Sequence, residues 1–155
     1  MSERRVVVTG MGEITPVGKN VQENWNSLVN GKSGISIIKR FDVSNYSSQV
    51  GGEVDDFNPS EYGIGPKKAR KIDLFVQFAL AAAKEAYEQS GLDMDKESPS
   101  RCGAIIGSGI GGLNTIEREY KKMIKRGPKR VSPFLIPAMI IDMASGQVSI
   151  EYGLQ

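Results

Sequence analysis

The two residue types that most often act together as nucleophile and base, cysteine and histidine, are almost absent from this sequence. It contains no histidine, and Cys102 is its only cysteine. A cysteine nucleophile requires a base or a cationic neighbour that stabilises the thiolate. Because no histidine can serve as that base, and because an apolar run follows Cys102, we interpret it as a small buried hydrophobic residue. No residues have the spacing of a zinc site, so we predict no metal.

One glycine motif, Gly107-x-Gly109-x-x-Gly112, matches the dinucleotide-binding fingerprint and stands between an expected strand and an expected helix. The fingerprint also requires an acidic residue about 20 positions further on, at the end of the next strand. That region, 125–130, is basic here. We therefore predict no cofactor. The motif indicates instead that the backbone passes close to a ligand, another strand or a second subunit.

Basic residues form two clusters. The first lies at the start of an expected helix, where cations oppose the helix dipole, so helix stability does not explain it. The second contains seven basic residues and one acidic residue, Glu119, between positions 118 and 130. Lysines in the middle of that helix are typical of a solvated face. The first cluster and the end of the second indicate an acidic partner; these residues are Lys67, Lys68, Arg70, Lys71, Lys129 and Arg130. Nucleic acid is disfavoured as a partner, because aromatic residues do not alternate with these charges.

The most apolar loop of the sequence is Phe134-Leu135-Ile136, between Pro133 and Pro137. Packing into a core is one explanation for it. A pocket wall or a subunit interface is the other.

The elements that must position these residues follow from hydrophobic periodicity. Segments 4–10 and 102–107 are short apolar runs ended by glycine, typical of buried strands. Helices are expected at 21–29, 72–90 and 113–124, with Asn20 capping the first, and a short strand near 50–54. Pro137 should occupy the first position of a further helix within 133–152. The run 79–83 is rich in alanine and should let another backbone come close. Two units of strand, glycine turn and helix predict an α/β layered fold.

Composition is typical of one soluble globular domain, with 155 residues, 39% hydrophobic and 25% charged. The net charge of +2 does not by itself imply nucleic acid. A single cysteine fits a reducing compartment, so we expect a cytoplasmic protein. The N-terminus has no secretory signal, and no apolar run approaches the roughly 20 residues that span a bilayer.

Several motifs together closely resemble the β-ketoacyl-[acyl-carrier-protein] synthases, type II in particular. They are Arg4 to Gly12, Thr15 to Gly18, Gly107 to Gly112 and Val131 to Phe134, with Asp73, Ser90-Gly91-Leu92 and Gly146-Gln147 in register. The resemblance covers Arg4 to Gln155 and implies the N-terminal half of a thiolase-like layered fold, incomplete in this chain. It also implies a homodimer that elongates acyl chains on acyl carrier protein in fatty acid biosynthesis.

The family's cysteine and two histidines are expected beyond Gln155, so residues 1–155 form the N-terminal part of the domain and contain no catalytic residue. We expect this chain alone to be inactive. The resemblance implies that Ile110 gates an acyl pocket and that Leu135, often Phe in the family, reaches the pocket of the other subunit. Phe134 belongs to the same apolar loop. It also implies that Lys67, Arg70, Lys71, Lys129 and Arg130 dock the acidic carrier protein, with Lys68 as an adjacent candidate.

Two other functions remain open at this point. One is the opening of a polyketide-type ketosynthase with the same chemistry. The other is a non-catalytic subunit that binds carrier protein or dimerises with a ketosynthase. The residue at the family's cysteine position would distinguish the enzymes from such a subunit.

Overall fold

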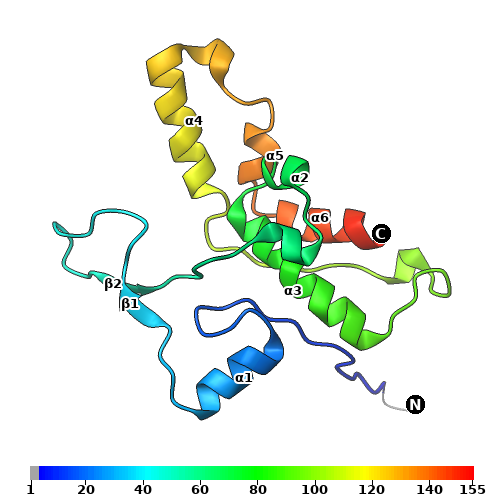
Figure 1. Ribbon diagram of the computed structural model, residues 1–155. Helices are drawn as coiled ribbons and strands as arrows, with labels where there is room; N and C mark the ends of the chain where they lie inside the picture. Colours follow the sequence, from blue (N-terminus) through cyan, green and yellow to red (C-terminus); the bar gives the residue numbers. More distant parts are fainter. Residues whose placement is uncertain (1–3) are drawn as a thin grey trace.

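The computed structural model describes residues 4–155, and its long helix α3 lies at the centre of the molecule (Figure 1). Helix α6 packs against α3, whereas α4 and the β1–β2 hairpin extend outward from the centre. The elements, with 3₁₀ helices labelled η, are α1 (Val21–Val29), β1 (Ile35–Ile37), β2 (Val50–Gly52), η1 (Pro59–Tyr62), α2 (Pro66–Ala69), α3 (Leu74–Ser90), η2 (Pro99–Arg101), α4 (Leu113–Arg126), η3 (Pro128–Arg130), α5 (Leu135–Met139) and α6 (Met143–Tyr152).

Helix α1 begins and ends where its sequence signals predict. The Asn20 side chain accepts a hydrogen bond from the Glu23 backbone N–H at 2.8 Å, which satisfies one free donor of the first turn. The Glu23 carboxylate reaches back to the N–H of Lys19 at 2.8 Å, one residue earlier than in a standard capping box. Gly31, with φ of 67°, follows the C-cap and turns the chain away.

Helix α3 carries the small face that the alanine run predicts. The N-terminal segment crosses it so closely that a Cβ atom on Gly12 would overlap the carbonyl oxygen of Ala82. The carboxylate of Glu85 holds this crossing in place, because it accepts the N–H groups of Glu13 at 3.0 Å and Val21 at 2.9 Å. Glycine is therefore required at position 12 for the chain to lie on the helix.

The hydrophobic core lies between α3 and α6. Its buried members are Ile64, Val76, Leu80 and Val148, and Tyr87 stacks on Tyr152 with ring centroids 4.3 Å apart. Ala144 of α6 is also buried. Pro137 is the third residue of α5 rather than the first, so the predicted helix start was two residues late. A proline is still accommodated there, because the first four N–H groups of a helix have no partner within it.

The prediction of buried strands at 4–10 and 102–107 was wrong for the structure in hand. Both segments are extended but pair with no strand among residues 4–155, and Val8 is 80% exposed. A β-strand needs hydrogen-bonding partners that its own sequence cannot supply. The described residues form a single two-stranded antiparallel sheet, in which β1 pairs with β2 and Ser36 lies opposite Gly51. This hairpin contains the strand expected near 50–54.

Candidate functional site

The glycine turn before α4 packs against backbone, as its composition indicates. Gly112 donates its N–H to the carbonyl oxygen of Met139 at 3.1 Å, and a Cβ on Gly112 would lie 2.5 Å from the carbonyl oxygen of Ala138. Gly111 has φ of 75°, which favours glycine. The neighbour is none of the three that the motif suggested: it is the C-terminal end of helix α5 in the same chain.

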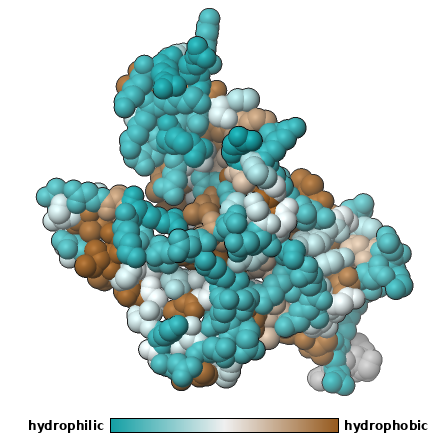
Figure 2. Space-filling view, viewed as in Figure 1, coloured by the Kyte–Doolittle hydropathy of each residue, from teal (hydrophilic) through white to brown (hydrophobic). Residues whose placement is uncertain are grey.

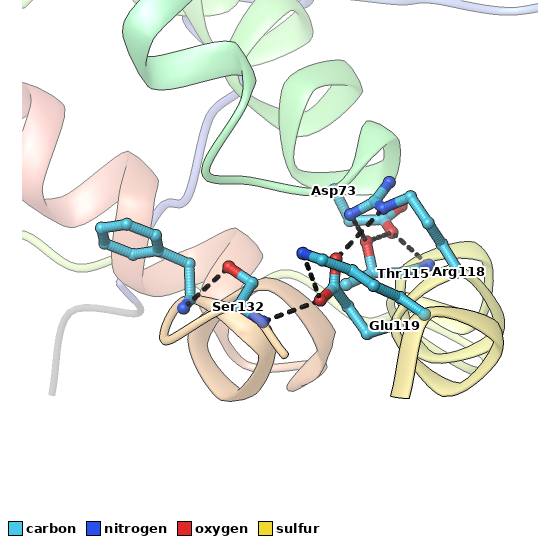
Figure 3. Close-up of polar contacts among 7 residues, drawn as sticks. Asp73, Thr115, Arg118, Glu119 and Ser132 are labelled. Carbon is cyan, nitrogen blue, oxygen red and sulfur yellow. Dashed lines mark hydrogen bonds and ion pairs between the residues drawn. The ribbon is translucent and has the colours of Figure 1, made fainter. Parts of the chain in front are cut away.

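The start of α4 is fastened to the start of α3 by one buried carboxylate, that of Asp73 (Figure 3). Its Oδ1 caps α3 by accepting the Leu74 N–H at 2.7 Å, and its Oδ2 accepts the backbone N–H of Thr115 at 3.2 Å. The Thr115 hydroxyl also donates to Oδ2, and only 2% of Thr115 is exposed. Asp73 thus satisfies donors of two helices at once and joins their N-terminal ends.

A second buried carboxylate, that of Glu119 on α4, holds the segment that follows η3 (Figure 3). Its Oε2 accepts the backbone N–H of Ser132 at 2.7 Å, and it forms ion pairs with Lys122 at 3.3 Å and Arg118 at 3.5 Å. The hydrogen bond from Ser132 is the main reason that the pKa of Glu119 lies below its ordinary value. Lys122 and Arg118 lower that pKa further, while burial opposes them. Glu119 is therefore a carboxylate stabilised in its charged form.

The segment held by Glu119 carries the apolar loop. The N–H of Phe134 donates to the Ser132 hydroxyl at 3.2 Å, and the Lys71 ammonium lies 4.6 Å from the centre of the Phe134 ring. A cation at this distance from an aromatic face is attracted to it. A narrow crevice joins the two sets of predicted residues, since Arg70 and Lys71 line it together with Phe134 and Leu135.

The remaining basic residues lie around this crevice on different elements. Lys67 and Arg70 are exposed on α2 and at its C-terminal end, and Lys129 and Arg130 are exposed on η3. Only three residues separate Arg130 from Phe134, so η3 and the end of α2 flank the same loop. In Figure 2 the projecting lobe formed by α4 and η3 is almost entirely hydrophilic. Lys68 differs from the others because it forms an ion pair with Glu151 of α6 at 2.5 Å.

Ile110 lies on the exposed glycine turn and is 67% exposed. The turn contacts the C-terminal end of α5 through Gly112 and Met139, whereas Leu135 begins that same helix. Helix α5 therefore separates Ile110 from Phe134 and Leu135.

Cys102 is not the fully buried residue that the sequence predicts. It is a free, partly exposed thiol whose backbone N–H donates to Pro99 at 3.0 Å and whose carbonyl oxygen accepts the Gln155 N–H at 3.1 Å. Within residues 4–155, histidine, cysteine and acidic side chains form no cluster suited to a metal ion. No helix in the same range is long and apolar enough to cross a bilayer.

A family profile described as "Beta-ketoacyl synthase, N-terminal domain" matches residues 3–155 of this sequence. The chain belongs to the β-ketoacyl synthase family. Two proteins named 3-oxoacyl-[acyl-carrier-protein] synthase 2, from Vibrio harveyi and Coxiella burnetii, are each 47% identical to it over 155 residues. The chain spans 37% of the length of each of these relatives. The family predicted from the sequence motifs is confirmed.

Solved structures of β-ketoacyl synthases have the same architecture. A ketosynthase in complex with its type II polyketide acyl-carrier protein matches 98% of this chain, and 40% of its own, with a TM-score of 0.80 and 32% identity. The ishigamide ketosynthase/chain length factor matches 99% of this chain, and 38% of its own, with a TM-score of 0.85 and 28% identity. The predicted thiolase-like layered fold is thereby confirmed for this N-terminal portion of a β-ketoacyl synthase.

Sequence reasoning missed how Thr115 and Glu119 act in this β-ketoacyl synthase domain, and it used Asp73 only as a residue that fits the family's motifs. Asp73 directly precedes an apolar-periodic run, which is a signal for an N-cap. Glu119 is the single acidic residue in a strongly basic stretch, which is a signal for a local ion network. The contact of Asp73 with Thr115 spans 42 positions and has no local signal.

Proposed function

We propose that the complete protein is a 3-oxoacyl-[acyl-carrier-protein] synthase of fatty acid biosynthesis and that this chain supplies its acyl-pocket wall and its carrier-protein surface. The observation that carries the proposal is the shared crevice, in which basic Arg70 and Lys71 meet apolar Phe134 and Leu135. A condensing enzyme needs this combination, because its substrate joins an acidic carrier protein to an apolar acyl chain. The 47% identity to named synthases supports the reaction class.

The proposed reaction has two stages. A cysteine thiolate attacks the thioester of an acyl-carrier protein, forms a new thioester on the enzyme and releases the carrier thiol. Malonyl-carrier protein then loses CO₂, and the resulting carbanion displaces the cysteine thiolate from the acyl carbonyl, giving a product two carbons longer. Cys102 does not match the family's nucleophile, so the remainder of the protein must provide it together with the histidines. This chain alone should show no turnover with acyl- and malonyl-carrier protein.

The pocket wall is assigned to Ile110, Phe134 and Leu135. Phe134 is 41% exposed, and Ile136 and Ile140 of the same stretch are also exposed. Apolar surface of this kind is typical of an interface or of a ligand pocket. We therefore propose that this stretch meets a second copy in a homodimer and that Leu135 extends into the other subunit's pocket. The protein is placed in the cytoplasm, in keeping with its one free cysteine.

The acidic carrier protein is proposed to dock on the cations that flank this loop, all of them exposed except Lys71, which is half-buried. They are Lys67, Arg70, Lys71, Lys129 and Arg130, whereas the ion pair with Glu151 directs Lys68 toward α6. Charge pairing of this kind acts mainly on the association rate. Exposed pairs are worth about 0.2–1 kcal/mol each, so single substitutions should be mild.

The test uses the complete protein carrying Arg70→Glu together with Lys129→Glu. The KM for acyl-carrier protein should rise strongly at low salt, and the effect should shrink as salt shortens the Debye length to about 3 Å at 1 M. The KM for the corresponding acyl-CoA should stay unchanged. A matched control reverses two exposed lysines elsewhere, Lys32→Glu with Lys96→Glu, and should alter neither substrate. Equal weakening of both substrates, or of neither, overturns the docking assignment.

A polyketide ketosynthase is the second candidate, because the solved relative at 32% identity belongs to a type II polyketide system. The higher identity to the named 3-oxoacyl synthases favours the fatty acid reaction. The two candidates differ in their product. A polyketide enzyme extends an unreduced 3-oxo chain repeatedly, whereas a fatty acid synthase accepts a saturated chain for each round, so the preferred acyl substrate distinguishes them.

A further inference from the structure

Glu119 is a buried charged group that the proposed reaction does not use. It is 5% exposed, although it belongs to a helix whose other charged residues face solvent. Burying a carboxylate is costly unless it is paired and hydrogen-bonded. Its burial is compensated by one backbone donor and two cations, Lys122 and Arg118.

The partners of Glu119 divide into two kinds. Lys122 and Arg118 belong to α4 itself, so these ion pairs do not connect α4 to another element. The third partner is the backbone N–H of Ser132, 13 residues further along the chain, at 2.7 Å. Of the three contacts that Glu119 makes, only this one joins the loop to the helix, and it acts on the backbone rather than on a side chain.

The hydrogen-bonding chain continues from Ser132 toward the pocket. The Ser132 hydroxyl accepts the N–H of Phe134 at 3.2 Å, and the Ser132 carbonyl oxygen accepts the N–H of Leu135 at 3.1 Å. Two of the three proposed pocket residues, Phe134 and Leu135, thus donate their backbone N–H groups to Ser132, and Ser132 in turn donates its own N–H to Glu119. On the other side, Lys71 covers the Phe134 ring at 4.6 Å.

From this geometry, and resting on the function proposed above, we infer that Glu119 is a positioning residue of the acyl-pocket wall. Its carboxylate sets where the loop carrying Phe134 and Leu135 stands, and so how deep a chain the pocket accepts. It touches no substrate. Long acyl chains, which reach the wall, should sense its loss, whereas short chains should not.

The test compares three variants of the complete protein. Glu119→Ala removes the acceptor and the charge, and Glu119→Gln keeps an acceptor oxygen while losing the charge. Glu117→Gln is the matched control, because Glu117 is an exposed glutamate of α4 whose ion pair, with Lys121, stays within the same helix. Steady-state kinetics on short and long acyl-carrier substrates and the melting temperature are measured for each.

Glu119→Ala should lower the ratio of kcat/KM for long over short chains about tenfold, because Ser132 loses its partner. Glu119→Gln should restore most of that ratio, and Glu117→Gln should leave it unchanged. An equal fall for both chain lengths, with a lower melting temperature, would mean that Glu119 is structural only and overturns the inference.

Hydrogen exchange separates failure of this inference from failure of the proposed function. If the wild type and Glu117→Gln elongate no acyl chain, the proposed function fails. The rate of amide hydrogen exchange at 131–135 still reports how firmly the loop is held. Exchange there should be about tenfold faster in Glu119→Ala than in Glu119→Gln, since a local opening becomes easier once its hydrogen bond is gone. Equal exchange in the two variants overturns the positioning role whatever the activity.

Discussion

The region around α4 and the two extended segments differ in whether their hydrogen-bonding groups have partners and their apolar side chains are covered. Around α4, buried carboxylates at Asp73 and Glu119 accept donors from neighbouring elements, and within residues 4–155 no buried side-chain polar atom lacks a partner. In segments 4–10 and 102–107, apolar side chains such as Val8 stay exposed and the backbone pairs with no strand in that range. The first region satisfies its buried polar groups within itself, whereas the second leaves its backbone without strand partners among residues 4–155.

The largest effect is expected where an extended segment does meet a helix. Gly12→Ala places a methyl group on the Ala82 carbonyl oxygen, so the complete protein should lose more than about 3 kcal/mol of unfolding free energy or fail to fold. Gly65→Ala is the control, because that position has φ of −62° and open space. Urea unfolding measures both. Similar losses for both variants would show that the contact with α3 is unimportant.

A smaller loss of unfolding free energy is expected when the carboxylate that joins α3 to α4 is removed. Asp73→Ala leaves the N–H groups of Leu74 and Thr115 without partners and should cost about 2–3 kcal/mol. Asp142→Ala should change stability by less than about 0.5 kcal/mol, because Asp142 precedes α6 without a side-chain capping bond. Equal midpoints of urea unfolding for the two variants would contradict the role of Asp73.

Helix α3 illustrates how far sequence reasoning reaches. Its apolar period and Gly91 predict its course, and the structure ends it at Ser90 with Gly91 at φ of 66°. These signals are local, because a helix forms its hydrogen bonds within itself. The segments 4–10 and 102–107 show the limit, because a strand requires partners from elsewhere in a chain. The site divides in the same way: the basic and apolar residues were visible in the sequence, but the contact of Asp73 with Thr115 was not.

Glu119 should make the stability of the region around α4 depend on pH. Its pKa is lowered in the folded protein, so its stabilisation is present above the ordinary value of 4.5 and is lost as the pH falls through the lower folded value. Glu119→Gln should therefore cost about 1–2 kcal/mol at neutral pH. The gap in unfolding free energy between wild type and variant should close below pH 4.5. A gap of constant size down to pH 3 in urea unfolding would exclude this role.

The smallest effect concerns the contact between Lys71 and the Phe134 ring. Lys71→Met removes the cation but keeps much of the length, and should cost about 0.5–1 kcal/mol. Lys67→Met, an exposed lysine of α2, should cost less. A double-mutant cycle with Phe134→Leu measures the coupling directly. Additive losses would show that Lys71 and Phe134 do not interact in solution.

The unpaired segments also have a consequence for biosynthesis. In a protein of the relatives' length, of which this chain spans 37%, more than half of the polypeptide is still unmade when Gln155 leaves the ribosome. Translation at about 5–20 residues per second makes that interval tens of seconds. Throughout it, the valines at 6–8 and Ile105 are exposed on free backbone edges, which are templates for aggregation. During that interval these two exposed segments are the parts of the described chain most open to aggregation.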